Sequence, residues 1–454
     1  MPKKKTALTI EERLQQALVP AEEQPYEVPE NWVWVRLGDV NKYISKSVNP
    51  ISEPDKIFEL YSVPSMVDNY PEIIAGSDIG SSKQSVCKKD VLLCKINPRI
   101  NRVWKVSQFT DNELIASSEW IVIRNNHIDA NYLMYCFQSK YFREFMLSNV
   151  SGVGGSLMRA QPKYVQTYPI PLPPLSEQQR IVERIEELFA KLDEAKERLQ
   201  EVADSFAVRK VAILHKAFTG ELTKQWRREN GVSDESWEEK KGEDFFEYVT
   251  SGSRGWAKYY SDKGSIFVRM GNLNHGTIEL DFSDIQYVEL PDQVEGQRSK
   301  LQKNDILISI TADVGMIGLV REDMDAYINQ HVALARPKND LYAEFLAWYF
   351  VSDVGLQQMQ NKQRGATKIG LGLQDIRSII LKIPTLPEQH EIVRLIDDLL
   401  ARERAAQQAA EQALASIDLM KKSILARAFR GELGTNKASE ASALELLKQV
   451  LAEN

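Results

Sequence analysis

The feature that most constrains this chain of 454 residues is an internal repeat. Residues 175–182 read LSEQQRIV and residues 386–393 read LPEQHEIV, while residues 213–222 (ILHKAFTGEL) match residues 424–433 (ILARAFRGEL). Both matches are offset by 211 positions, so the segment between the two blocks has the same length in each copy. Loops tolerate insertions and helices in a fixed register do not, and the equal spacing therefore predicts a long helix in each copy.

A weaker similarity precedes each helix. In both copies an aspartate, Asp90 or Asp305, precedes an apolar strand-like segment, and a second strand-like segment and an aromatic-rich, helix-like segment follow. The corresponding ranges are 91–96 and 306–311, 119–124 and 331–336, and 132–137 and 345–350. The offsets drift by a few residues, as in diverged domains with loops of different length. The predicted order is therefore globular unit, helix, globular unit, helix.

The predicted helices carry the apolar pattern of a coiled coil. In the first, apolar residues recur in alternating steps of four and three from Ile181 to Phe206, which is a sustained heptad pattern. In the second, equivalent positions include Ala406, Ala410 and Ala413, whose small side chains permit close approach of a partner helix. An amphipathic helix packed on its own domain is the alternative. We expect the two helices to form an antiparallel coiled coil.

These patterns predict an α+β fold with an internal tandem repeat, in which two mixed α/β domains are separated by two long helices. The short strands expected in the second domain are 267–270, 277–280, 285–288 and 306–310. Short amphipathic helices are expected at 7–18 and 443–451. The expected parts are an N-terminal segment 1–29, a first globular domain 30–173, a first long helix 174–222, a linker 223–236, a second globular domain 237–384, a second long helix 385–433 and a C-terminal short helix 434–454.

Composition argues against several classes of protein. No run approaches about 18 apolar residues, which argues against a transmembrane helix, and the segment MPKKKTALTI lacks the apolar core of a secretory signal. Cys87, Cys94 and Cys136 are too few and too irregularly spaced for a disulfide framework or a zinc site. We expect a cytoplasmic protein with reduced thiols and no membrane contact.

The sequence lacks the common catalytic motifs. The segment nearest to a phosphate-binding loop, GSDIGSSK at 76–83, has the wrong spacing, and no GxGxxG follows a strand-like segment. The tetrapeptide INPR at 96–99 does not match the Asn/Asp-Pro-Pro-aromatic motif of amino-methyltransferases. The five histidines do not pair at the spacing of metal ligands. We therefore expect a recognition or scaffold subunit, with no catalytic residues and no metal, and not an enzyme.

The duplicated motifs resemble those of the specificity subunit of type I restriction–modification systems. In that family, two variable globular units are each followed by a helix that opens with P-L-[SP]-E-Q-x-x-I-V and ends with A-F-x-G-E-L. The matching segments are PLSEQQRIV at 174–182, TLPEQHEIV at 385–393, KAFTGEL at 216–222, RAFRGEL at 427–433 and the opening ENWVWVRLGD at 30–39. The second copy of that opening, SWEEKKGED at 236–244, is a looser match, but the resemblance covers nearly the whole chain.

The resemblance implies a DNA sequence-specificity subunit. Each globular unit would be a target recognition domain that reads one half of a bipartite double-stranded DNA target, and the helices would fix the spacer between the halves. The implied partners are two methyltransferase (modification) subunits and two motor–nuclease (restriction) subunits. S-adenosylmethionine, ATP and Mg would be cofactors of those partners, and this chain would hold none.

Other functions stay open from the residues alone. The specificity subunit of a type IIB-like restriction system would differ only in its partners, and a coiled-coil adaptor would not bind DNA. A stand-alone nuclease would need metal-dependent cutting by this chain. Two recognition units on one face of a duplex require half-sites about 10 bp apart, or a multiple of that, which is compatible with the predicted helical rod.

The net charge of −7 argues at first against nucleic acid as a partner, but the charges are unevenly distributed. Residues 20–30, 176–206 and 229–247 together carry a net charge of −14, which leaves +7 for the rest of the chain. Residues 83–163 carry +6 and residues 357–382 carry +4. Basic residues near turns in these stretches are therefore candidates for contacts with DNA.

The candidates combine cations that suit phosphates with arginine and asparagine, which suit guanine and adenine in the major groove. A solvated surface charge is the alternative for each cation, and Asn272 and Asn274 also suit a turn. The predicted DNA-binding residues are Lys83, Lys95, Arg99, Arg102, Ser156, Arg159 and Lys163 in the first domain, and Arg269, Asn272, Asn274, Arg298, Lys300, Arg364, Thr367 and Lys368 in the second.

Charged outer positions of the first long helix are candidates for docking the methyltransferase. Ordinary solvated charges with weak pairing along the helix are the alternative. The predicted partner-binding residues are Glu177, Arg180, Arg184 and Glu187.

Overall fold

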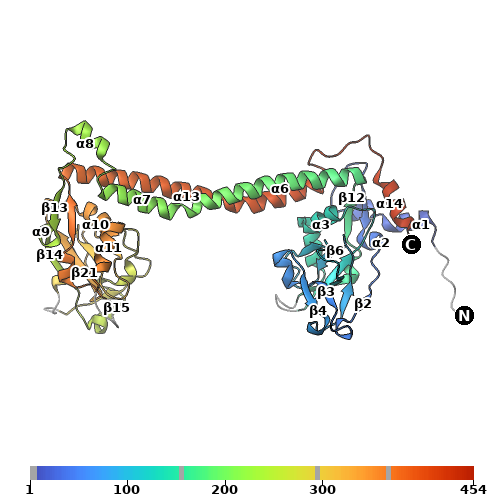
Figure 1. The fold of residues 1–454 in the computed structure, drawn as a ribbon, viewed down its shortest axis with the longest axis horizontal. Helices are drawn as coiled ribbons and strands as arrows, with labels where there is room; N and C mark the ends of the chain where they lie inside the picture. The colour runs from blue at the N-terminus through green and yellow to red at the C-terminus, as the bar shows by residue number, and fades with distance from the viewer. Residues whose placement is uncertain (1–7, 153–157, 292–296, 364–369, 454) are drawn as a thin grey trace. The chain divides into compact units, whose positions relative to one another are not determined.

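The computed structural model describes residues 8–152, 158–291, 297–363 and 370–453, and it divides into two compact units. Unit 1 comprises Met1–Leu199 and Ala413–Asn454, and unit 2 comprises Gln200–Gln412 (Figure 1). Each unit contains a mixed α/β part and segments of two long helices, so the predicted α+β fold is confirmed. Within the described residues, no helix is long and apolar enough to cross a bilayer.

Unit 1 contains a five-stranded sheet of order β2-β5-β8-β3-β4 and a three-stranded antiparallel sheet of order β7-β6-β9. The first and last strands of this unit, β1 and β12, pair antiparallel and so join the two ends of the globular part. The strands are β1 (Val33–Arg36), β2 (Ser47–Val48), β3 (Ile57–Tyr61), β4 (Glu72–Ala75), β5 (Lys83–Ser85), β6 (Val91–Cys94), β7 (Val103–Lys105), β8 (Glu113–Ala116), β9 (Trp120–Ile123), β10 (Val150–Ser151), β11 (Arg159–Ala160) and β12 (Pro169–Leu172). The helices are α1 (Ile10–Ala17), α2 (Leu37–Val40), α3 (Ala130–Gln138), α4 (Lys140–Ser148), α5 (Pro162–Val165), α6 (Leu175–Asp204) and α14 (Ala443–Ala452).

Unit 2 contains two four-stranded sheets, of order β14-β21-β18-β19 and β15-β17-β16-β20, and the antiparallel pair β13-β22. The strands are β13 (Glu238–Lys241), β14 (Phe246–Ser251), β15 (Tyr260–Ser261), β16 (Ser265–Val268), β17 (Tyr287–Val288), β18 (Ile306–Ser309), β19 (Ile317–Leu319), β20 (Ala326–Ile328), β21 (Val332–Pro337) and β22 (Ile380–Ile383). The helices are α7 (Phe206–Phe218), α8 (Lys224–Asn230), α9 (Gly242–Phe245), α10 (Ala343–Val351), α11 (Asp353–Asn361), α12 (Leu373–Arg377) and α13 (Leu386–Ala428), whose last residues belong to unit 1, with 3-10 turns η5 (Trp256–Tyr259) and η7 (Gln297–Ser299).

The strands β6 in unit 1 and β18 in unit 2 are each buried on both faces. Alternate residues of β6 contribute to two different apolar cores of unit 1, and alternate residues of β18 do the same in unit 2. A strand buried on both faces has a continuous apolar sequence without alternation, which explains the runs VLLC and ILIS. The two strands therefore occupy equivalent places in the repeat.

The aspartate before each of these strands has a structural role. Asp90 is buried and forms a 2.6 Å ion pair with Arg124, and Asp305 is buried and forms a 2.7 Å ion pair with Arg336. Burial raises the pKa of Asp305, and the arginine opposes that shift. The weak sequence similarity around these aspartates thus reflects a shared framework, built from the same buried pair in both units.

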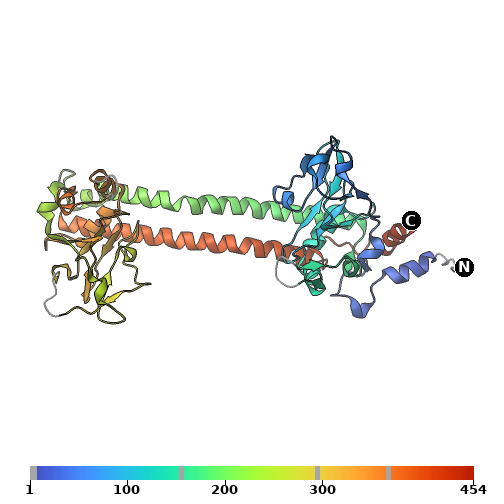
Figure 2. The ribbon, with the colours of Figure 1, turned by 90° about the horizontal axis from the view of Figure 1, so that it is seen from below.

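The long helices pack antiparallel to each other within each unit. In unit 1, the N-terminal half of α6 shares a core with the C-terminal end of α13, and Lys421 pairs with Asp193 at 2.5 Å. In unit 2, α7 shares a core with the N-terminal half of α13, and Arg209 pairs with Glu403 at 2.7 Å. Figure 2 shows the helices side by side in a second view. The predicted antiparallel packing is confirmed.

The first predicted helix, 174–222, corresponds to α6, which ends at Asp204, and α7, which begins at Phe206. The helical hydrogen bonds continue across Ser205, because its amide donates to the Glu201 carbonyl at 3.2 Å and its carbonyl accepts from the Arg209 amide at 3.0 Å. The Ser205 hydroxyl also donates to the Val202 carbonyl at 2.6 Å. The predicted heptad pattern is interrupted near this point, because the Val202 side chain is 43% exposed.

The prediction of a strand at 277–280 is wrong. The Ile278 carbonyl accepts a hydrogen bond from the Leu319 amide at 2.7 Å, but the segment forms no strand. Ile278 is fully buried, but one backbone hydrogen bond to β19 does not make a ladder of paired residues. The short helices predicted near the ends of the chain are confirmed as α1 and α14, which pack against each other in unit 1.

Candidate nucleic-acid interface

Two predicted residues of unit 1 meet at the turn of residues 117–120. The Lys95 ammonium donates to the Ser118 carbonyl at 2.6 Å, and Arg159 pairs with Glu119 at 3.0 Å. A β-bridge between residues 96 and 159 brings these side chains together, because it places the segment after β6 beside β11. Each cation therefore has a partner in the free protein, and a phosphate would compete with that partner.

The other predicted cations of unit 1 lie in several places. Lys83 is half-buried on β5, where burial lowers the pKa of its ammonium, and it donates to the Ser81 hydroxyl at 2.7 Å. Lys163 lies over the Tyr164 ring, 4.6 Å from its centre. Arg102 is half-buried, whereas Arg99 is exposed and pairs with no acid among the described residues. The predicted residue Ser156 lies outside the described part of the chain.

The turn after β16 in unit 2 corrects one prediction. Asn272 is only 3% exposed, and its side-chain oxygen accepts from the Arg269 amide at 2.9 Å. Its side-chain nitrogen donates to the Asp281 and Asp284 carbonyls at 2.8 and 2.9 Å. Both ends of the amide are therefore used inside the protein, and Asn272 holds the turn together instead of contacting DNA. Asn274 is exposed, and Arg269 pairs with Asp284 at 2.9 Å.

The predicted residues Arg298 and Lys300 lie in different surroundings. Lys300 pairs with Asp325 at 3.1 Å, and this bond raises the pKa of its ammonium. Arg298, on η7, is exposed and faces a cleft. The predicted residues Arg364, Thr367 and Lys368 lie outside the described part of the chain.

The cleft that Arg298 lines has a volume of about 820 Å³. Arg254, Lys258 and Arg298 are its charged lining residues, and no aspartate or glutamate lines it among the described residues. Its remaining lining residues are Ser251, Gly252, Ser253, Gly255, Trp256, Tyr259, Pro291 and Gln330. The charged side chains among the described lining residues of the cleft are therefore all cationic, and Trp256 and Tyr259 give it an aromatic wall.

Two of the four residues predicted to bind a partner are used inside unit 1. Glu177 is fully buried and accepts from the Trp32 indole at 2.8 Å and from the Asn436 amide at 2.9 Å. Arg180 pairs with Glu440 at 2.7 Å. These contacts attach the segment after α13 to the start of α6, which corrects the prediction of solvent-facing docking residues.

The other two predicted partner-binding residues are exposed. Arg184 pairs with Glu187 at 2.7 Å, and Lys191 pairs with the same glutamate at 2.7 Å. Exposed pairs of this kind contribute little to stability, so these side chains remain available for a partner.

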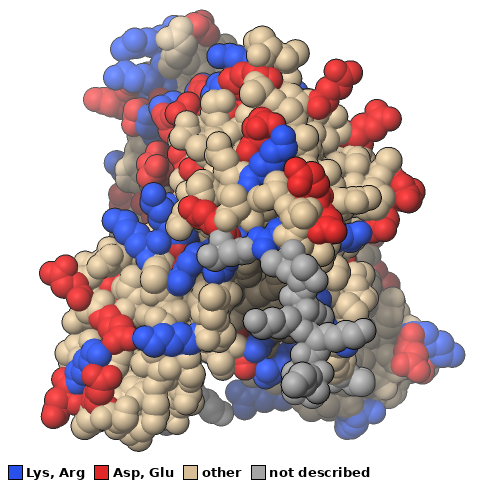
Figure 3. All heavy atoms as spheres, turned by 90° about the vertical axis from the view of Figure 1, so that its right-hand side faces the viewer, with Lys and Arg blue, Asp and Glu red and all other residues tan. Residues whose placement is uncertain are grey.

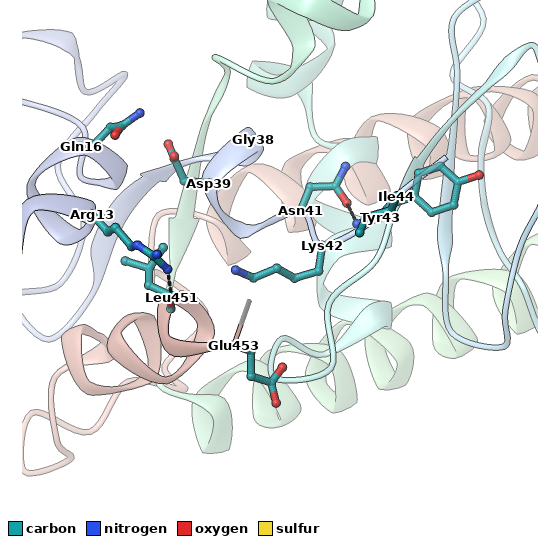
Figure 4. A pocket seen from close by; sticks show the side chains of 10 residues that line it. All are labelled: Arg13, Gln16, Gly38, Asp39, Asn41, Lys42, Tyr43, Ile44, Leu451 and Glu453. Carbon is teal, nitrogen blue, oxygen red and sulfur yellow. Dashed lines mark hydrogen bonds between the residues drawn. The ribbon is translucent and has the colours of Figure 1, made fainter. Parts of the chain in front are cut away.

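A second cavity, of about 690 Å³, lies in unit 1 where α1 and α14 meet α2 (Figure 4). Figure 4 shows Arg13 bonded to the Leu451 carbonyl, at 3.3 Å, and the Lys42 side chain pointing into the cavity. Burial raises the pKa of Asp39, which also lines it. The cavity mixes both signs of charge, and this does not favour a polyanion.

The surface around α1 and α14 shows the same mixture. Figure 3 views the molecule from that side, and acidic and basic side chains are interspersed over it. A protein that attracts nucleic acid through a broad field gathers cations on one face. This face lacks such a field, in contrast to the cleft of unit 2.

Comparison with known proteins identifies the family of this chain. Residues 29–204 and 234–413 match the model of the type I restriction modification DNA specificity domain. The chain belongs to this family. The match occurs twice, once in each unit, which confirms the specificity subunit predicted from the duplicated motifs.

Individual relatives agree with that assignment. The chain is 30% identical over 306 residues to the EcoBI specificity subunit of Escherichia coli, which covers 63% of this chain and 64% of that protein. It is 28% identical over 345 residues to the EcoKI specificity subunit of Escherichia coli (strain K12), which covers 72% of each. The crystal structure of the HsdS subunit from Thermoanaerobacter tengcongensis has the same fold, with a TM-score of 0.68, 22% identity and coverage of 90% of this chain and 99% of that one.

Sequence analysis missed two charged residues of this specificity subunit that line the cleft. Arg254 and Lys258 lie in the segment GSRGWAKYY, where basic residues alternate with glycine and aromatic residues. That interleaving was a usable signal for nucleic-acid binding. The signal is easily missed because the segment is short and lies outside the two stretches with a high net positive charge.

Proposed function

We propose that this specificity subunit reads a bipartite double-stranded DNA target, with one half-site read by each unit. The observation that carries the proposal is that the two units share a buried framework but expose different side chains. In both units a strand buried on both faces is followed by a segment that forms a β-bridge, Ile96 to Arg159 in unit 1 and Thr311 to Gly370 in unit 2. Equivalent frameworks with unlike exposed side chains suit two half-sites of unlike sequence.

The long helices are proposed to set the spacer between the half-sites. Their antiparallel packing within each unit supports this, because a paired helix resists bending more than a loop does. Inserting seven residues into both helices would keep the heptad register and add about 10 Å of helix. We expect a spacer longer by about 3 bp with unchanged half-sites, whereas altered half-sites would contradict the proposal.

The same helices are proposed to dock two methyltransferase subunits. Val208 and Leu419, which are offset by 211 positions, are 70% and 65% exposed. Large apolar side chains exposed at equivalent places in a repeat suit two copies of one partner. Val208→Asp and Leu419→Asp should each remove one methyltransferase from the complex, measured by native mass spectrometry. Val67→Asp, at an 88% exposed residue of unit 1, is the control.

Catalysis is proposed to belong to the partners. Two motor–nuclease subunits would join the complex, and S-adenosylmethionine, ATP and Mg would bind to the partner subunits and not to this chain. The location would be cytoplasmic, where those partners meet DNA. Reconstitution tests this, because omission of this chain should abolish sequence-specific methylation while leaving S-adenosylmethionine binding by the methyltransferase intact.

The decisive experiment is to map methylated adenines in a host that carries the complete system. A single motif with two defined half-sites and a fixed spacer is expected. Loss of that motif on deletion of this chain would support the assignment, and methylation that persists without it would refute the assignment. A motif with only one defined half would refute the two-unit model.

A further inference from the structure

We infer that the cleft of unit 2 lined by Arg254, Lys258 and Arg298 grips the DNA backbone beside the second half-site. This inference rests on the proposed function and identifies the surface through which one unit acts. It adds Arg254 and Lys258, which are not among the predicted DNA-binding residues, and it gives Arg298 a defined place.

The charge of the cleft supports a polyanionic ligand. Its three cations are exposed, and within the described residues none of them has an acidic partner. Other predicted cations of this unit are already paired, as Lys300 is with Asp325 and Arg269 with Asp284. As far as the described residues show, a phosphate can bind the cleft cations without first breaking an ion pair, and this lowers the cost of binding there.

The loop that carries Arg254 is held rigidly against the fold. The Gly252 amide donates to the Asn329 carbonyl at 3.2 Å, and a Cβ at Gly252 would lie 1.9 Å from the Ile328 carbonyl oxygen. Ser253 forms a β-bridge with Asn329. A rigid loop presents its cation in one place, so less conformational entropy is lost on binding.

The floor of the cleft is aromatic and buried. Trp256 is 4% exposed, and its ring centre lies 5.6 Å from that of Phe267 and 5.4 Å from that of Tyr327. Lys258 lies over the Tyr259 ring, 4.9 Å from its centre. Both residues line the cleft. The volume, about 820 Å³, admits a segment of sugar–phosphate backbone and excludes a whole duplex.

The test uses the complex of this chain with its methyltransferase partners and a labelled duplex that carries the mapped target. Affinity is measured by fluorescence anisotropy between about 50 and about 200 mM salt, where phosphate contacts have their strongest effect. The variants are Arg254→Gln, Lys258→Gln and Arg298→Gln, singly and together. Lys240→Gln is the matched control, because Lys240 lies on β13, pairs with Glu238 and does not line the cleft.

Each single variant should weaken binding about tenfold, the size of one charge-assisted hydrogen bond. The triple variant should reduce the slope of log affinity against log salt by about 2 to 3, since each lost phosphate contact contributes about 0.9. Unchanged thermal unfolding would show that the exposed substitutions leave the fold intact. Weakening confined to the target, with relaxed methylation in one half-site, would indicate base contacts and would contradict a grip on the backbone.

The inference and the proposed function fail in different ways. If the wild-type complex methylates a bipartite motif and the triple variant binds like Lys240→Gln with the same salt slope, the cleft is not a DNA site. If the wild-type complex methylates no such motif, the proposed function itself is refuted, and the inference with it.

Discussion

Replacing Glu388 with glutamine should destabilise unit 2 by about 3 kcal/mol. Glu388 is fully buried, and one of its oxygens accepts from Arg227 and from the Thr223 hydroxyl, both at 2.7 Å. Burial lowers the pKa of Arg227, but its bonds to Glu388 and Asp234 raise it overall, so the guanidinium stays charged. Removing one partner of a buried ion pair costs about 3–5 kcal/mol. The lower value applies because Asp234 remains at 3.0 Å.

The repeat provides a matched control at Glu177, which is offset by 211 positions from Glu388. Glu177 is equally buried, but its partners are neutral: the Trp32 indole at 2.8 Å, the Asn436 amide at 2.9 Å and the Thr435 hydroxyl at 3.4 Å. A glutamine there keeps its carbonyl toward the two nitrogen donors and its amide toward the hydroxyl. Glu177→Gln should therefore cost no more than about 1 kcal/mol.

Differential scanning calorimetry of the purified chain separates the two cases. For a unit of this size, 1 kcal/mol shifts Tm by about 2–4 °C, so Glu388→Gln should lower the transition of unit 2 by about 6–12 °C. The transition of unit 1 should move far less in Glu177→Gln. Calorimetry is preferred because a chain with two cores need not unfold in a single step. Equal shifts in the two variants would show that the uncompensated arginine does not dominate, and would refute the reasoning.

Two further predictions concern the loop of the cleft and the segment after α13. Gly252→Ala should destabilise unit 2 by more than about 2 kcal/mol in urea unfolding, because its Cβ would lie 1.9 Å from a carbonyl oxygen, whereas Gly271→Ala, with nothing within 4 Å, should not. Arg180 lowers the pKa of Glu440, so their pair stabilises the fold above the unfolded pKa of about 4.3 and is lost as pH falls through the lower folded value. The difference in Tm between wild type and Arg180→Ala should therefore shrink below about pH 4, and a constant difference would contradict an ionic origin.

The framework was predictable because burial constrains sequence strongly. The apolar runs of β6 and β18 and the heptad pattern of the helices all come from side chains that must leave water, and such patterns repeat with the period of the backbone. The exposure of Val202 was not predictable in the same way. This residue continues the heptad pattern in the sequence, and only the structure shows that its side chain is 43% exposed.

The candidate interface was less predictable, because the availability of a charge depends on residues far away in sequence. Arg159 is paired by Glu119, and Lys300 by Asp325, and neither acid is near its partner in the chain. Asn272 illustrates the same limit, since its three hydrogen bonds come from a turn that closes only in the folded unit. A count of net charge over a stretch cannot detect such pairing.

The two units separate the residues that fix the fold from those that face the ligand. Asp90 with Arg124, and Asp305 with Arg336, repeat one buried pair in two places, and a change in either would leave a buried charge uncompensated. No such penalty applies to Arg254 or the other exposed cations of the cleft, which can change without loss of packing. It follows that the exposed surface of unit 2 can diverge while the framework stays fixed. Exchange of the cleft cations for neutral residues should therefore weaken binding of every DNA sequence alike and leave the methylated motif unchanged, because phosphate contacts carry no sequence information.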